Sequence, residues 1–147
     1  MTTAAAIALS ALVAGTLDVT ATASLMGARG LPFRRVMQGV ASGALGGAAF
    51  QGGLSTASIG FVLHYCIACA WATLYGIAAL RWPALLARPL LLGVAYGLVV
   101  HFIMSGAVLP LSRLRSPFKW TAWLIQIPIH MVCVGIPIAW IQSLALR

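Results

Sequence analysis

The chain has very little charge. Of its 147 residues only 7% are charged and only Asp18 is acidic, whereas 62% are hydrophobic. A soluble domain carries about 25% charged residues, which make its surface compatible with water. So few charges cannot cover a water-exposed surface, and we therefore expect lipid to surround most of the chain. The length leaves room for one domain, residues 1–147.

The net charge of +8 arises because acidic side chains are almost absent, not because basic ones are abundant. A nucleic-acid-binding protein gathers Lys and Arg on one face, among other polar residues. Loops that border anionic lipid headgroups instead hold basic residues between hydrophobic runs. The nine basic residues here follow the second pattern: Arg29, Arg34, Arg35, Arg81, Arg88, Arg113, Arg115, Lys119 and Arg147. We expect the lipid bilayer as partner and no nucleic acid.

Cysteine is scarce, and its positions do not indicate a redox or structural zinc site. Cys66 and Cys69 form a Cys-x-x-Cys pair, but no second pair completes a zinc site. Both lie inside a hydrophobic run, one helical turn apart, where cysteine serves as a small apolar residue.

Four hydrophobic runs are long enough to cross a bilayer, whose hydrocarbon core takes about 20 helical residues. They cover residues 4–28, 55–80, 90–111 and 118–146. No basic residue precedes Arg29, so the first run lacks the basic start of a signal peptide, and we expect it to be a retained span. The sequence predicts an all-α membrane protein, a four-transmembrane-helix bundle.

Residues 32–46, between the first two spans, have apolar and polar side chains on opposite sides of a helix. The apolar side holds Phe33, Val36, Met37, Val40 and Ala44, and the polar side holds Arg34, Arg35, Gln38 and Ser42. This pattern is typical of a helix that lies at a membrane interface. We therefore expect one amphipathic interfacial helix between spans 1 and 2.

The basic residues also predict an orientation. Six of the nine fall in the first and third loops, and three fall on the opposite side. Because cytoplasmic loops are enriched in Lys and Arg, loops 1 and 3 are predicted to be cytoplasmic.

The chain's one acidic side chain and its three histidines occupy corresponding positions, one on each span: Asp18, His64, His101 and His130. Measured from the side of loops 1 and 3 at ~1.5 Å per residue, they lie at roughly 14–18 Å, close to one level. Ionisable groups are costly inside a membrane and normally face partners or cavities. We expect the four to face the bundle interior, with Asp18, His64 and His130 within ~10 Å of one another, about one interhelical spacing.

Small residues share the helix faces of these four side chains and predict close helix packing. They are Gly15 near Asp18, Gly60 near His64, and the stripe Gly93, Gly97 and Ser105 that contains His101.

The chemistry leaves several roles open for Asp18, His64, His130 and His101. They could act as structural polar contacts, as a transition-metal site for zinc, iron or copper, or as a proton or ion relay. Cys133 and Met104, one turn from His130 and His101, would add soft ligands to a metal site. Two histidines on facing spans also suit haem b. No nucleophile motif is present, so we do not expect an enzyme.

A different class of function is a small accessory or assembly subunit. Such a chain would recognise a membrane-protein partner, or a second copy of itself as a homo-oligomer, through its glycine-rich faces.

Several short motifs resemble a known family. They are Gly15-Thr16-Leu17-Asp18, Gln38-Gly39-Val40-Ala41-Ser42-Gly43, Ala49-Phe50-Gln51-Gly52-Gly53, Leu63-His64, Tyr96-Gly97, Leu109-Pro110-Leu111-Ser112, His130-Met131 and Gly135-Ile136-Pro137-Ile138-Ala139. Together they resemble a widespread family of small four-span bacterial inner-membrane proteins that has no assigned activity. The resemblance implies a location in the bacterial inner membrane. Asp18, His64 and His130 match the pattern, whereas His101 stands where the pattern has a different residue.

Overall fold

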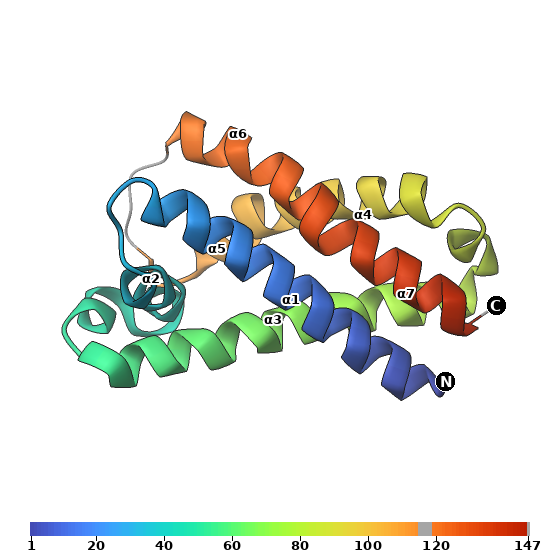
Figure 1. The fold of residues 1–147 in the computed structure, drawn as a ribbon, viewed down its shortest axis with the longest axis horizontal. Helices are drawn as coiled ribbons and strands as arrows, with labels where there is room; N and C mark the ends of the chain where they lie inside the picture. The colour runs from blue at the N-terminus through green and yellow to red at the C-terminus, as the bar shows by residue number, and fades with distance from the viewer. Residues whose placement is uncertain (115–118, 147) are drawn as a thin grey trace.

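In the computed structural model, which describes residues 1–114 and 119–146, the chain forms helices and, within those residues, no strand (Figure 1). Four continuous helical segments are long and apolar enough to cross a membrane: α1 (Thr3–Gly27), α3 (Gly53–Arg81), the segment Pro89–Leu111 and the segment Trp120–Leu146. The third comprises α4 (Pro89–Ile103), η3 (Met104–Val108) and α5 (Leu109–Leu111), and the fourth comprises α6 (Trp120–Ile129), η4 (His130–Gly135) and α7 (Ile136–Leu146). Where the predicted bounds fall on described residues, each helix begins and ends within two residues of them. The all-helical prediction is confirmed for the described residues.

Helix α1 contacts α3 along one side and α7 and η4 along another, and α4 packs against η4 and α7 (Figure 1). The buried residues of α1 are mostly small: Ala6, Ser10, Ala11, Ala14, Gly15 and Val19. Small side chains let neighbouring helices approach closely where lipid offers no hydrophobic driving force for association.

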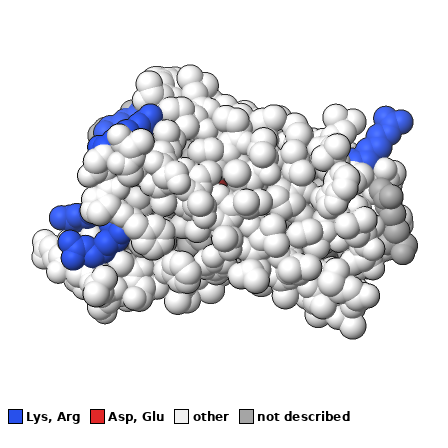
Figure 2. Space-filling model, in the orientation of Figure 1, with Lys and Arg blue, Asp and Glu red and all other residues white. Residues whose placement is uncertain are grey.

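Large apolar side chains point outward on all four long helices, for example Leu12, Val62, Leu91 and Val132. In the view of Figure 2, the Lys and Arg side chains gather at the two ends of the long axis and leave the middle free of them. A helix bundle with an apolar girdle and charged ends matches the cross-section of a bilayer.

Glycines set the separation between the helices, as their spacing predicts. A Cβ atom added at Gly97 would lie 2.5 Å from the His130 carbonyl oxygen, and one at Gly93 would lie 2.7 Å from Ile136 Cα. Gly135 faces both glycines from the other helix, and Gly60 lies against the Met37 backbone in the same way. The helices therefore touch backbone to backbone at these points.

Helix α2 (Phe33–Leu45) and the 3₁₀ turn η1 (Gly46–Phe50) fold back onto α3, which α2 contacts more than any other element. On the predicted polar side of this helix, Gln38 and Ser42 are only 1% exposed, whereas Phe33 of the predicted apolar side is 50% exposed.

The reason is the hydrogen bonding of Gln38. Its Nε2 donates to the Gly53 carbonyl at 3.0 Å and to Thr56 Oγ1 at 3.3 Å, and Arg35 donates to the Phe50 carbonyl at 3.1 Å. A buried amide needs such partners, and these acceptors lie in η1 and at the start of α3. The polar side of α2 therefore faces them, and part of its apolar side is turned outward.

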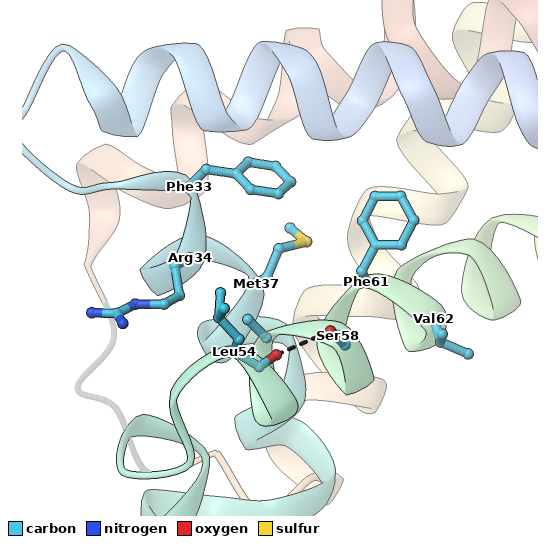
Figure 3. Close-up of a pocket in the computed structure, with 8 residues that line it drawn as sticks. Phe33, Arg34, Met37, Leu54, Ser58, Phe61 and Val62 are labelled. Carbon is cyan, nitrogen blue, oxygen red and sulfur yellow. Dashed lines mark hydrogen bonds between the residues drawn. The ribbon is translucent and has the colours of Figure 1, made fainter.

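The outward side of α2 and the start of α3 border a shallow hollow of about 290 Å³ (Figure 3). In the close-up, Phe33 and Met37 reach into the hollow from α2 and Phe61 reaches in from α3.

The third and fourth long helices each contain one π-helical segment, η3 and η4. Pro110 follows the first segment and Pro137 the second. A proline has no N–H to donate to the carbonyl four residues earlier, and its ring clashes with that carbonyl. The carbonyls concerned, those of Gly106 and Cys133, lie inside the two π segments. We attribute the local widening of both helices to these prolines.

Replacement of Gly135 by alanine should destabilise the bundle, because the new Cβ would meet the backbone of Gly93 and Gly97. We expect a loss of about 1–3 kcal/mol in the free energy of unfolding, the usual cost of overpacking. Titration of the detergent-solubilised protein with a denaturing detergent measures it. The control is Gly106→Ala, whose Cβ would meet no atom within 4 Å. Equal stability of the two variants would contradict the close contact.

Candidate functional site

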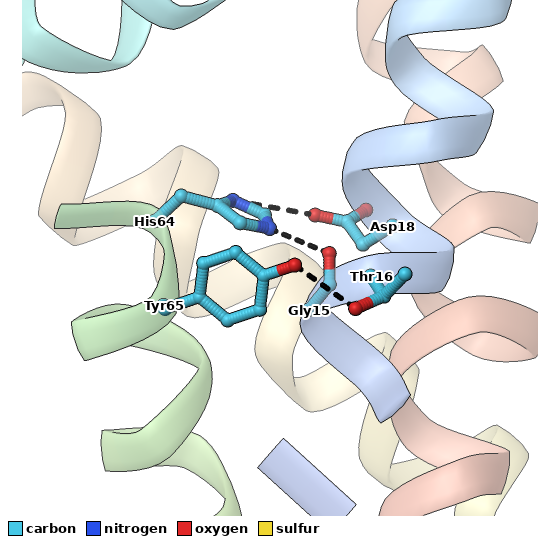
Figure 4. Close-up of polar contacts among 5 residues, drawn as sticks. All are labelled: Gly15, Thr16, Asp18, His64 and Tyr65. Carbon is cyan, nitrogen blue, oxygen red and sulfur yellow. Dashed lines mark hydrogen bonds and ion pairs between the residues drawn. The ribbon is translucent and has the colours of Figure 1, made fainter. Parts of the chain in front are cut away.

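Asp18 of α1 and His64 of α3 face each other across the helix interface (Figure 4). Asp18 Oδ2 lies 4.0 Å from His64 Nδ1, and the two side chains are 17% and 13% exposed. The other ring nitrogen, His64 Nε2, lies 2.8 Å from the Gly15 carbonyl oxygen. The chain's only acidic side chain thus lies beside a histidine that the α1 backbone orients.

The Gly15 carbonyl decides where one proton of the imidazole sits. A carbonyl can only accept a hydrogen bond, so His64 Nε2 must carry a hydrogen and donate it. Nδ1 then faces the Asp18 carboxyl either as a second N–H group, with the imidazole cationic, or as a bare lone pair. A bare lone pair facing a carboxylate would be repulsive, so in the second case Asp18 must hold the proton. In both cases the pair holds one proton, which lies either on the Asp18 carboxyl or on His64 Nδ1.

Neighbouring contacts hold the pair in position. Tyr65, the next residue after His64, forms a hydrogen bond of 2.9 Å between its hydroxyl and that of Thr16 on α1 (Figure 4). Gly15 fits beneath the Tyr65 ring, since an added Cβ would lie 3.1 Å from ring carbons. The α1–α3 contact is therefore fixed by Gly15 and Thr16 of α1 together with Tyr65 of α3, and not by the Asp18–His64 pair alone.

His101 of α4 and His130 of η4 form a second pair, with their Nδ1 atoms 3.1 Å apart. One of these nitrogens must donate to the other, so the two rings adopt opposite tautomers or one of them is protonated. His101 is only 2% exposed and its ring also packs edge-on against Trp123, with centroids 4.9 Å apart. The prediction that His101 faces a neighbouring helix is confirmed.

The two pairs lie at similar depth along the bundle. Counted from Gly27, Gly53, Leu111 and Trp120, the four side chains are each roughly 14–17 Å from the same end at ~1.5 Å per residue. Several buried polar atoms at this level have no hydrogen-bond partner among the described residues: Asp18 Oδ1, Thr22 Oγ1, His101 Nε2 and Gln126 Oε1. Thr22 follows Asp18 by one turn, and Gln126 precedes His130 by one turn. The site therefore has unused hydrogen-bonding capacity.

The structure joins the predicted residues two by two instead of in one cluster. Among the residues it describes, no three His, Cys or acidic side chains come together in a way that could hold a metal ion. The expectation of a zinc, iron or copper site on Asp18, His64, His101 and His130 is thus not met by the arrangement. Direct contact between His101 and His130 likewise leaves no space for a haem between their rings.

Cys133 and Met104, the two additional candidate metal ligands, lie in different surroundings. Cys133 of η4 is a half-buried free cysteine. Met104 packs against the hydrophobic core. Ser105, predicted as part of the packing stripe, donates to the His101 carbonyl of its own helix at 2.7 Å.

One buried polar contact, made by Gln142, was not predicted from the sequence. Gln142 of α7 donates to Ser10 Oγ at 3.1 Å and to the Ala72 carbonyl at 2.8 Å, which ties α7 to α1 and α3. Its position in a hydrophobic run was the available signal, since a neutral amide there also needs partners.

Comparison of the chain with protein-family models, with curated proteins and with solved structures gives no match. The family resemblance of its short motifs stays a prediction.

A double-mutant cycle tests the second pair. His101→Leu and His130→Leu should show a coupling of about 0.5–2 kcal/mol in the free energy of unfolding, the range for hydrogen bonds between membrane helices. The control cycle joins Ser105→Ala with His130→Leu. Ser105 bonds only to a backbone carbonyl of its own helix, so these effects should add. Additive effects in the His101–His130 cycle would show that the pair does not interact.

Proposed function

We propose that this chain is an integral membrane protein whose Asp18–His64 pair takes up and releases a proton within the bilayer. The four apolar helices, the outward apolar side chains and the charged ends support the membrane location. An ionisable side chain inside a membrane is expected to have a function, because its insertion costs several kcal/mol.

One observation carries the proton proposal. The Gly15 carbonyl holds one hydrogen on His64 Nε2, and the Asp18 carboxyl faces Nδ1 at 4.0 Å. In one state Asp18 is a neutral acid and His64 a neutral imidazole. In the other, the proton has moved from the Asp18 oxygen to Nδ1, and a carboxylate faces an imidazolium. This internal transfer moves one proton and leaves the pair neutral. Release then passes the proton to water and leaves the Asp18 carboxylate beside a neutral imidazole, a net charge of −1, and uptake of a proton from water restores the neutral pair.

The unpartnered atoms favour exchange with the surroundings over a purely structural contact. Asp18 Oδ1 and Thr22 Oγ1 are buried and have no hydrogen-bond partner among the described residues. Water molecules bridge such polar atoms when space permits. Water beside Asp18 would supply and remove the proton.

The glycine-rich faces do not favour an accessory subunit. Gly15, Gly60, Gly93 and Gly97 are each covered by another segment of the same chain. They are therefore used inside the bundle and do not form a free surface for a partner.

Infrared spectroscopy can follow Asp18 directly, because it is the only side-chain carboxyl in the protein. We expect one protonated-carboxyl band to appear and disappear with pH in the reconstituted protein, and Asp18→Asn to abolish it. His64→Gln should move the midpoint of this titration by about one pH unit or more, since a charged neighbour at this distance has an effect of that size.

Ser58→Ala is the matched control. Among the described residues Ser58 bonds to Leu54 of its own helix alone, so this change should leave the midpoint in place. If the Asp18 band does not change with pH, or His64→Gln leaves its midpoint in place, the pair is a structural contact and the proton proposal is wrong.

We further propose a bacterial inner-membrane location with loops 1 and 3 in the cytoplasm. The family resemblance supports the first point, and the six-to-three distribution of basic residues supports the second. Alkaline phosphatase fused after the last residue should then be active in a bacterial host, and green fluorescent protein fused there should be dark. The same reporters inserted in loop 1 should behave oppositely. The reverse pattern would invert the proposed orientation.

A further inference from the structure

The hollow between α2 and α3 continues along the outer face of α3. Its first part, about 290 Å³, is lined by Phe33, Arg34, Met37, Leu54, Ala57, Ser58, Phe61 and Val62. A second hollow of about 310 Å³ is lined by Ser58, Ile59, Val62 and Leu63. Because the two share Ser58 and Val62, they adjoin along α3. We call the two hollows together the α2–α3 groove.

The length of this groove matches one leaflet of a bilayer. From Leu54 to Leu63 the helix rises roughly 14 Å at ~1.5 Å per residue. Half of a hydrocarbon core of about 30 Å is ~15 Å. The walls are apolar, and the Ser58 hydroxyl is turned to the Leu54 carbonyl at 3.0 Å (Figure 3). A single acyl chain fits both the length and the chemistry.

The end of the groove at α2 carries uncompensated positive charge. Arg34 lines the groove there, and no other described residue hydrogen-bonds or ion-pairs with it. Its neighbour Arg35 is engaged with the Phe50 carbonyl and lies over the Phe50 ring at 5.9 Å. The chain's only acidic side chain, Asp18, is paired with His64. Arg34 is exposed, and within the described residues an anion for it would have to come from outside the chain.

We propose that the α2–α3 groove binds one anionic phospholipid, with an acyl chain along α3 and the headgroup phosphate at Arg34. The site rests on the proposed membrane location but not on proton exchange by Asp18. It also explains why α2 leaves Phe33 half exposed, since that side chain then borders the lipid instead of water.

Native mass spectrometry of the detergent-purified protein tests the site with phosphatidylglycerol and phosphatidylcholine of identical acyl chains. We expect phosphatidylglycerol to bind more tightly by about fivefold, the contribution of one basic residue near an anionic headgroup. Arg34→Gln should remove this preference. Arg88 is an exposed basic residue at the other end of the molecule, and Arg88→Gln should leave the preference unchanged.

A second pair of variants tests the apolar part of the groove. Ser58→Phe places a ring in both hollows and should weaken the binding of both lipids by at least about fivefold. Thr73→Phe is the control, because Thr73 lies on the same helix, bonds to a backbone carbonyl one turn earlier in the same way, and does not line the groove. Circular dichroism confirms that each variant is folded.

Three outcomes would overturn the proposal: equal binding of the two lipids, an equal loss with Arg34→Gln and Arg88→Gln, or displacement of phosphatidylglycerol by inorganic phosphate alone. The last would mean that Arg34 binds a soluble anion. Extraction of the protein from membranes by alkaline carbonate would contradict both this site and the membrane location. Lipid binding without a titrating Asp18 would leave the site intact and refute only the proton proposal.

Discussion

The backbone contact between α4 and the fourth long helix is the constraint on which the rest of the bundle depends. Gly93 and Gly97 meet Gly135 and the His130 backbone so closely that no Cβ fits between them. This contact sets the helix separation and thereby the reach of the side chains on either side of it. His101, one turn beyond Gly97, can touch His130 directly only because the helices are this close.

In these apolar surroundings, several buried or partly buried polar side chains form hydrogen bonds to another helix. His64 reaches the α1 backbone, Tyr65 reaches Thr16, and Gln142 reaches both α1 and α3. Each bond contributes modestly, on the order of 0.6 kcal/mol in comparable membrane proteins, but together they specify one register. The exceptions carry the functional argument. Of the buried polar atoms without a partner in the described parts of the chain, most belong to Asp18, His101 or residues one turn from the pairs.

Patterns within single helices were predictable from the sequence, and contacts between helices were much less so. The bounds of the long helices follow from hydrophobic run length, and the close approach at Gly60, Gly93 and Gly97 follows from the absence of side chains there. Periodicity identified the two faces of α2 but not which of them is covered. Gln38 is covered because its amide finds acceptors at the start of α3.

The sequence by itself determined the helices, the location of the charges, and the placement of one ionisable side chain on each span, because these depend on local composition and the fixed rise of a helix. Only the tertiary structure decided the partners. Asp18 faces His64, and His101 faces His130, although residue types and depths would equally allow one group of four. The difference lies in the rotation of each helix about its axis. That rotation is set by glycine contacts and backbone acceptors on other helices, which no single segment specifies.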